Sequence, residues 1–105
     1  MAAESSVTGG DSLVVVTEPL TAAMLPGWQA MLTRVLDARP ARLIIDLSDT
    51  PSIDADGITA LLAIHRRLVS GGGQLIVRAP NARIRRLFEL ARVNGVLTLE
   101  TEARP

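Results

Sequence analysis

The sequence predicts one α/β domain built on a mostly parallel or mixed β-sheet of four to five strands, with helices alternating with the strands along the chain. The first supporting observation is size, because 105 residues, 48% of them hydrophobic, suffice for one core but not for two. The second is that short apolar runs alternate with longer segments whose apolar residues recur at helical spacing. Short polar loops join these segments, which is typical of βαβ crossovers.

The folded domain is expected to begin after a polar segment. Residues 1–11 contain small and polar side chains around Gly9-Gly10, so we expect them to form a flexible N-terminal arm. The first apolar run, Leu13–Val16, predicts the first strand. We expect the domain itself to span residues 12–100 and residues 101–105 to form a C-terminal tail.

The first helix and the second strand follow. From Thr21 onward apolar residues recur with a period of about 3.6 residues, which predicts a helix ending near Asp37. Pro26 is compatible with this helix because it falls near the first turn. The short, β-branched run Arg42–Leu47 is bounded by polar turns and is typical of a buried central strand.

The rest of the chain continues the alternation. One apolar face over residues 58–69 predicts a second helix that starts at Asp56-Gly57 and ends at three consecutive glycines. Leu61 on that face and Ile45 on the preceding strand are expected to be fully buried. The last predicted elements are a third strand, a third helix and a short final strand: Gln74–Ala79, a helix starting at Pro80-Asn81, and Val96–Leu99.

The composition excludes several classes of chemistry. Eleven arginines balance eleven acidic residues, and the chain has no lysine and no cysteine. Schiff-base chemistry, a P-loop lysine, a disulfide framework and thiolate zinc sites are therefore absent. With one histidine, one Trp, one Phe and no Tyr, little remains for a catalytic triad or a base-stacking platform. We expect a protein that is not an enzyme and needs no cofactor.

The charge pattern bears on partners and location. With no net charge and no aromatics among its arginines, the chain is not expected to bind nucleic acid. No apolar run approaches about 18 residues and the N-terminus lacks the charged and apolar regions of a signal peptide. We therefore expect a cytoplasmic protein without direct membrane insertion.

The stretch SIDADGI, residues 52–58, carries the most specific signal in the chain. Its two carboxylates directly precede a glycine and a helix, so it could be a metal loop, a phosphatase site or a recognition turn. A calcium loop needs a bidentate Glu six residues after the glycine, where this chain has Ala63. The calcium reading is therefore disfavoured.

A phosphatase remains a remote alternative. The tetrapeptide Asp-Ala-Asp-Gly is similar to the nucleophile loop of haloacid-dehalogenase-type, metal-dependent phosphatases, in which one aspartate attacks phosphorus and a second moves the proton. That chemistry needs a cation for the phosphate, normally a lysine, and a buried strand directly before the first aspartate. Here the chain has no lysine, and the stretch before Asp54 contains Asp-Thr-Pro-Ser, residues 49–52, rather than a buried strand.

The position of the loop favours recognition. It joins the carboxyl end of a central strand to a helix N-terminus, which is where parallel sheets place their binding sites. Asp54, Asp56 and Gly57 would lie near the positive end of the helix, where an aspartate can cap free N–H groups. Two interpretations stay open from position alone, a capped turn and a docking loop.

Several motifs in the right order resemble a known family. The run LIIDLSDTPSIDADGITALLAIHRRLVSGGGQLIVRAPNARIRRLFELARVNGV contains a strand ending in Asp-Leu-Ser, an Asp-Ser-Ser-Gly-like loop, an amphipathic helix, a Gly-Gly turn, a further strand and a Pro-x-x-x-x-Arg-Leu-Phe-Glu-Leu segment. This order resembles the STAS domain of anti-sigma factor antagonists. The match covers roughly residues 12–100.

The resemblance implies a non-enzymatic interaction module that regulates a sigma factor by binding an anti-sigma factor of the serine-kinase type. In such antagonists the residue before the loop glycine is a phosphorylated Ser or Thr, and here that position holds Asp56. Ala55 replaces the neighbouring hydroxyl residue, and the nearest hydroxyls, Ser52 and Thr59, do not match the acceptor position. The resemblance thus implies a docking loop of Asp54, Ala55, Asp56, Gly57, Ser52 and Thr59 in which the phosphorylation site is lost.

A second STAS class is the alternative. The first helix, with its Leu-Pro-Gly-Trp, also looks like the STAS subunit of bacterial lipid-asymmetry transporters, which docks on an ABC-type ATPase and needs no phosphoserine. Where relatives carry Gly-Glu-Leu-Asp before that helix, this chain has Glu18-Pro19-Leu20-Thr21, and Thr21 is expected to cap the helix.

Overall fold

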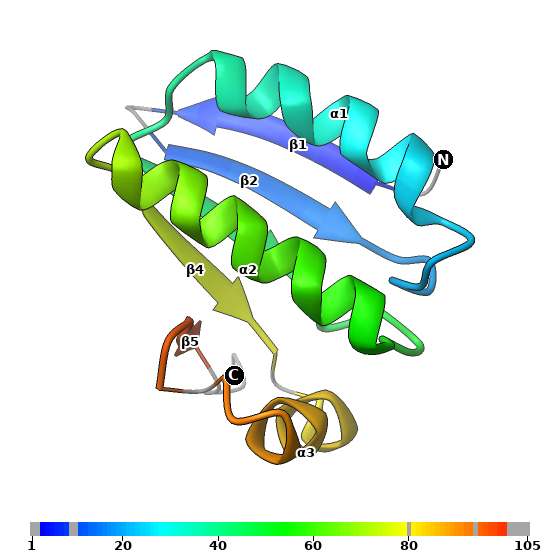
Figure 1. Ribbon diagram of the computed structural model, residues 1–105. Coiled ribbons are helices and arrows are strands. Elements are labelled where there is room, and N and C mark those ends of the chain that lie inside the picture. Colours follow the sequence, from blue (N-terminus) through cyan, green and yellow to red (C-terminus); the bar gives the residue numbers. More distant parts are fainter. Residues whose placement is uncertain (1–2, 9–10, 80, 94, 101–105) are drawn as a thin grey trace.

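Five strands form one mixed sheet in the order β1-β2-β3-β4-β5, and three helices alternate with them (Figure 1). The computed structural model describes residues 3–8, 11–79, 81–93 and 95–100. β1 runs antiparallel to β2 and the other pairs are parallel, so the predicted fold class is confirmed. The elements are β1 (Ala3–Thr8), β2 (Asp11–Val16), α1 (Leu25–Asp37), β3 (Arg42–Asp46), α2 (Ala55–Ser70), β4 (Gln74–Arg78), α3 (Ala82–Leu90) and β5 (Thr98–Glu100).

The N-terminal segment differs from the expectation of a flexible arm over residues 1–11. Residues 3–8 form β1, which pairs with β2 in a register that places Ala3 opposite Val16 and Thr8 opposite Asp11. Backbone pairing at a sheet edge needs no apolar side chains, so the polar composition of this segment concealed the strand. The Gly9-Gly10 pair between two six-residue strands is the sequence signal that could have revealed a hairpin.

One face of the sheet is covered more fully than the other. In β2, Ser12, Val14 and Val16 are buried, whereas Leu13 and Val15 are only partly buried. The covered face is the side on which α1 and α2 lie next to each other in front of the strands (Figure 1). β3 is the central strand, as predicted, but it is buried on one face only, because both helices pack on the same side.

The first helix is shorter than predicted. α1 begins at Leu25, and its N-cap residue is Met24, which provides no side-chain cap. The expectation that Thr21 caps the helix is therefore wrong. The backbone carbonyl of Thr21 instead accepts hydrogen bonds from the N–H groups of Met24 and Leu25 in a turn that precedes the helix. Pro26 lies in the first turn, as expected.

The core fills the space between the sheet and these helices. Leu61 of α2 and Ile45 of β3 are fully buried, as predicted. Trp28 of α1 is 4% exposed and Phe88 of α3 is fully buried, so both large aromatic side chains belong to the core. Packing of α2 on the sheet fixes the direction in which the helix leaves the preceding loop.

The C-terminal elements follow the predicted order with shifted boundaries. Asn81 is the N-cap of α3, and its side chain accepts a hydrogen bond from the N–H of Arg83. The final strand covers Thr98–Glu100 rather than Val96–Leu99, because Val96 lies in a turn and is 52% exposed. A hydrogen bond of 2.6 Å from Arg78 Nε to Glu100 Oε1 links β5 to β4.

Candidate partner-binding loop

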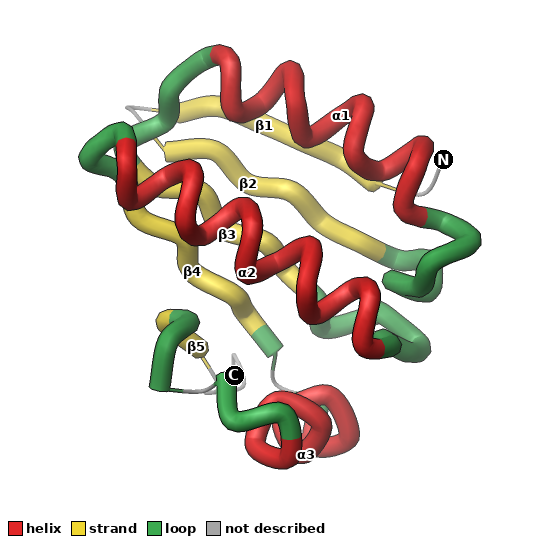
Figure 2. Tube along the Cα trace, in the orientation of Figure 1, coloured by secondary structure: helices red, strands yellow, loops and turns green. Residues whose placement is uncertain are grey.

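The acidic stretch lies where β3 gives way to α2, at the carboxyl ends of the parallel strands (Figure 2). The connection from Leu47 to Asp54 leaves β3 and enters α2 at Ala55. The preceding loop, from Thr17 to Met24, connects β2 to α1 at the same edge of the sheet. Two consecutive crossover loops therefore meet at one end of the domain.

Asp54 is held by the fold through both of its carboxylate oxygens. Oδ1 accepts a hydrogen bond of 2.9 Å from the N–H of Gly57, and Oδ2 accepts one of 3.2 Å from the N–H of Ala22 in the other loop. The hydrogen bond from Gly57, supported by that from Ala22, lowers the pKa of the Asp54 carboxyl below its ordinary value. The side chain caps α2 and ties the two loops together.

The cap corrects the predicted start of the second helix. The sequence placed that start at Asp56-Gly57, but α2 begins at Ala55 and Asp54 is its N-cap, in an extended conformation. Asp56 lies inside the first turn, where its charge is favoured by the helix dipole. Two aspartates spaced two residues apart could not be ranked as caps from the sequence, because each has the side chain that the position prefers.

Gly57 is the point of closest contact between the loops. A Cβ atom on Gly57 would lie 2.2 Å from the backbone oxygen of Leu20 and 2.9 Å from Ile53 Cγ1. Leu20 and Ile53 form a parallel bridge, in which the Leu20 N–H donates to the Ser52 carbonyl at 2.9 Å and the Asp54 N–H donates to the Leu20 carbonyl at 3.3 Å. Only a glycine permits this approach at position 57.

A buried hydroxyl anchors the other side of the loop. Thr50 is 1% exposed, and its Oγ1 donates a hydrogen bond of 2.6 Å to the carbonyl of Val16 at the end of β2. Neither Thr50 nor Leu20 could be recognised from the sequence as part of the loop structure. A threonine among polar loop residues and a leucine before a helix carry no local signal for contacts made more than 30 residues away.

The predicted site residues separate into two groups. Asp54 and Gly57 serve the fold, and Ser52 contributes its backbone carbonyl. Ala55, Asp56 and Thr59 are exposed on α2. Within the described residues the carboxylate of Asp56 makes no hydrogen bond or ion pair, so its charge is available at the surface.

The chemistry open to the loop is limited by its ligand groups and by the helix cap. Among the described residues no group of three His, Cys, Asp or Glu side chains is arranged to hold a metal ion. The fully engaged carboxylate of Asp54 is poorly placed to act as a nucleophile, because both oxygens accept backbone hydrogen bonds. None of the helices within residues 3–8, 11–79, 81–93 and 95–100 has the length and apolarity needed to cross a membrane.

The mixed five-stranded sheet, the alternating helices and the capped loop before α2 define the protein as a single α/β domain. The family comparison agrees with that class, since the model of the STAS domain matches residues 2–103. The chain therefore belongs to the STAS domain family. No curated protein sequence matches the chain significantly.

Solved structures share the fold at low sequence identity. An anti-sigma factor antagonist from Mycobacterium paratuberculosis matches with a TM-score of 0.87 and 23% identity over 96% of this chain and 86% of that one. The unphosphorylated anti-sigma factor antagonist SpoIIAA matches with a TM-score of 0.73 and 17% identity over 98% of this chain and 90% of that one. A sulfate transporter family protein from Wolinella succinogenes has a TM-score of 0.74 and 20% identity over 92% of this chain and 81% of that one.

Proposed function

We propose that this protein is an anti-sigma factor antagonist that binds a serine-kinase-type anti-sigma factor through the exposed start of α2, in the cytoplasm and without catalysing a reaction. The observation that carries the proposal is the division of labour between the two aspartates. Both carboxylate oxygens of Asp54 accept hydrogen bonds, one in the cap of α2 and one from the neighbouring loop. Asp56 is exposed and unpaired within the described residues, so its conspicuous charge serves no structural contact.

The contact surface consists of small and polar side chains on a rigid base. Asp56, Thr59 and Ala63 are exposed at helical spacing on α2, so they share one face of the helix. Gly57 and Leu20 lock the base of that face beneath them. Binding of a partner here would cost little conformational entropy in the loop, because the fold already fixes the loop.

Asp56 gives this protein a permanent charge at the position where the family resemblance implies a phosphorylatable hydroxyl. A carboxylate carries about one negative charge, against roughly 1.5 to 2 for a phosphoserine, and it offers fewer acceptor oxygens. We propose that binding is consequently not switched by phosphorylation at this position. The partner surface must accommodate one carboxylate, and regulation must come from the partner or from the amount of this protein.

A transporter role is the alternative, because the first helix with its Leu-Pro-Gly-Trp resembles the STAS subunit of lipid-asymmetry transporters. The fold is also shared with a sulfate transporter family protein. In that case the same exposed start of α2 would dock on an ABC-type ATPase of a lipid transport complex. A fixed carboxylate suits this arrangement as well, since a permanent subunit needs no phosphorylation switch. The two functions differ in the identity of the partner rather than in the surface that binds it.

Affinity capture from the source cells tests the proposal with three baits. Wild type and Asp37→Arg, a matched charge reversal at the carboxyl end of α1, should both recover a serine-kinase-type anti-sigma factor, whereas Asp56→Arg should not. Recovery of an ABC-type ATPase by the same two baits would instead establish the transporter role. Equal recovery of the partner by all three baits would show that docking does not involve the start of α2.

A further inference from the structure

The strand order leaves one face of the sheet without helices. β2, β3, β4 and β5 follow one another across the sheet in chain order, and each neighbouring pair is parallel. Crossovers between parallel strands are right-handed, so three steps in the same direction place α1, α2 and α3 on the same face. Sheets of parallel strands are usually covered on both faces, so the opposite face of this sheet lacks a layer.

The uncovered face carries a row of apolar side chains. Along β3 the burial alternates, with Leu43 and Ile45 buried toward the helices and Ile44 partly exposed on the other side. The strand register aligns Ile44 with Leu13 of β2 and with Ile76 of β4, which are also partly exposed. We call the face that these three residues share the open face.

The central strand of the open face carries opposite charges on the two sides of its apolar residue. Arg42 lies two residues before Ile44 and Asp46 two residues after it, so all three side chains point to the same face. Arg42 pairs with Asp11, but its side chain is 46% exposed. Asp46 pairs with Arg78 at 3.7 Å. A guanidinium offers five donors and a carboxylate about four acceptor sites, so both Arg42 and Asp46 can take a further partner.

This charge pattern is complementary to itself. A half-turn about an axis that runs across the strands, along the apolar row, sets Ile44 against Ile44 of a second copy and Arg42 of each copy against Asp46 of the other. A half-turn about an axis along β3 would instead set Arg42 against Arg42 and Asp46 against Asp46. Only the first arrangement brings opposite charges together, which fixes the direction of the second copy.

We propose that the open face binds a second copy of this chain, sheet to sheet, with the two-fold axis along the row of Leu13, Ile44 and Ile76. Packed sheets lie about 10 Å apart, a gap that an arginine side chain can cross toward a carboxylate. Sheet twist rotates such layers by about 30° relative to each other. That rotation displaces side chains at the edges most and those on the central strand least, so the pairs between Arg42 and Asp46 are retained.

The size of the open face predicts a weak association. The five strands span about 24 Å and the five residues of β3 about 17 Å, which gives about 400 Å² for each copy. Stable complexes bury about 800 Å² per partner, so this dimer should form reversibly and only at high concentration. The surface lies on the opposite side of the sheet from α2, so the inference does not depend on the proposed docking of a partner there.

Sedimentation velocity of the purified protein at increasing concentration tests for the dimer. The sedimentation coefficient of wild type should rise with concentration toward that of a dimer. Ile44→Arg should weaken association about tenfold or more, because it places two like charges opposite each other on the axis. Val69→Arg, at an apolar residue of α2 that is 54% exposed, is the matched control and should associate like wild type.

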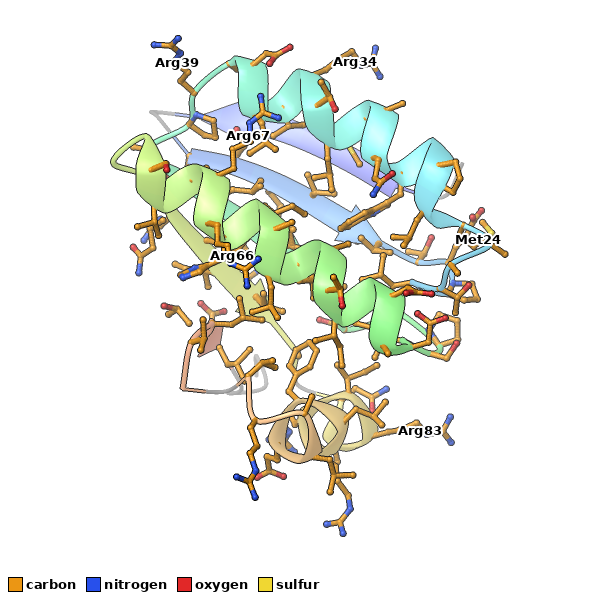
Figure 3. All side chains as sticks on the ribbon, in the orientation of Figure 1. Met24, Arg34, Arg39, Arg66, Arg67 and Arg83 are labelled. Carbon is orange, nitrogen blue, oxygen red and sulfur yellow. The ribbon has the colours of Figure 1, made fainter. Side chains whose placement is uncertain are left out.

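Reversed charges test the pairing across the axis. Arg42→Asp should weaken association about tenfold, since each copy then sets an aspartate against Asp46 of the other. Arg34→Asp is the matched control, because Arg34 is exposed on α1 and its side chain points away from the sheet (Figure 3). Asp46→Arg should also weaken association. An equimolar mixture of Arg42→Asp and Asp46→Arg should associate more tightly than either variant alone, because opposite charges then meet at both positions.

Cross-linking tests the direction of the axis without changing any charge. The chain has no cysteine, so an introduced cysteine is the only thiol. With the axis along the apolar row, Leu13→Cys and Ile76→Cys should each be joined into dimers by a short bis-maleimide when present alone. Mixing the two variants should not raise the yield. Val69→Cys should give only the low yield of random collisions.

Several results would overturn the proposal. A sedimentation coefficient that stays that of a monomer up to the highest concentration would show that the open face binds no second copy. Equal association of Ile44→Arg and Val69→Arg, both folded by circular dichroism, would place the contact elsewhere. A higher cross-linking yield in the mixture than in the single cysteine variants would place the axis along β3. A mixture of Arg42→Asp and Asp46→Arg that associates no more tightly than either alone, with both folded, would exclude the charge pairs.

Discussion

Gly57 lies so close to Leu20 that a single added methyl group would come within 2.2 Å of the Leu20 carbonyl oxygen. Because that oxygen belongs to the backbone, it cannot move aside as a flexible side chain could. We expect Gly57→Ala to destabilise the domain by about 1 to 3 kcal/mol, the usual cost of overpacking. Denaturant unfolding followed by circular dichroism measures this change.

Gly71→Ala is the matched control for this substitution. A Cβ atom at Gly71, just after α2, would lie 3.7 Å from its nearest neighbour, which is ordinary contact. The control should therefore retain nearly wild-type stability. Equal losses in the two proteins would mean that the contact between Gly57 and Leu20 does not constrain the loop.

Truncation of the core tests the phase of α2 on the sheet. Leu61 and Ile45 are both fully buried, so Leu61→Ala or Ile45→Ala should each cost about 2 to 5 kcal/mol. Arg67, on the exposed side of α2, should cost less than about 0.5 kcal/mol when truncated to alanine. Similar shifts of the denaturant midpoint for Leu61→Ala and Arg67→Ala would show that the helix packs in another orientation.

The capping carboxylate should make stability depend on pH in the acid range. Hydrogen bonds from Gly57 and Ala22 lower the pKa of Asp54 in the folded protein below its ordinary value of 3.8. A lowered folded-state pKa contributes stability that is fully present above the unfolded-state value and is lost as pH falls through the folded-state value. Unfolding measured from neutral to strongly acidic pH should therefore show this loss.

Asp54→Asn isolates that contribution, because the amide oxygen can still accept a hydrogen bond but does not titrate. At neutral pH the variant should be less stable than wild type, and the difference should shrink as pH falls below about 4. Asp49→Asn, at an exposed loop aspartate outside the cap, is the matched control and should keep nearly wild-type stability at neutral pH. A constant difference between wild type and Asp54→Asn at all pH values would mean that the charge of Asp54 does not matter for the cap.

Much of the fold could be predicted because its signals are local. Apolar periodicity defined α2 and the burial of Leu61, and the alternation of runs defined the central position of β3. β1 escaped prediction because its pairing is made by backbone groups, which no side-chain pattern reports. The start of α1 was misplaced because Thr21 has a capping side chain but the chain turns there without using it.

The candidate loop was found by sequence, but the division of its roles was not. The motif identified Asp54, Asp56 and Gly57 together, since all three are typical of a helix start. Their separation depends on Leu20 and Ala22, more than 30 residues away, which engage Asp54 and Gly57 and leave Asp56 exposed. Contacts between loops that are distant in the chain have no local signature, and only the structure reveals them.

The proposal that this protein is not an enzyme predicts no turnover of phosphoesters. Purified protein should release no phosphate from p-nitrophenyl phosphate, with or without added Mg²⁺. The reason is that the chain has no lysine to bind the phosphate and that both oxygens of Asp54 are engaged in the cap. Turnover that is present in wild type and lost in Asp54→Asn, with the fold retained, would contradict the prediction.

Introducing a hydroxyl at position 56 tests the role of the Asp56 charge. Asp56→Ser should change stability by less than about 1 kcal/mol, because Asp54 retains the cap and only an exposed charge near the helix end is lost. Denaturant unfolding of the two proteins measures this. A large loss of stability would mean that Asp56 has a structural contact that its exposure does not suggest.

The effect of Asp56→Ser should instead appear in binding. If the partner is a serine-kinase-type anti-sigma factor whose surface rejects a phosphate at this position, removing the carboxylate should tighten binding measured by calorimetry, and the new serine should accept phosphate from ATP, detected by mass spectrometry. A partner adapted to the carboxylate should bind the variant less tightly, because its complementary group loses the charge that it pairs with. Either change would establish the start of α2 as the interface.

Asp37→Ser, a matched loss of an exposed charge at the carboxyl end of α1, is the control and should alter neither the affinity nor the phosphate incorporation. Equal affinities of wild type and Asp56→Ser, with no phosphate incorporated, would reduce the acidic stretch to a capped turn.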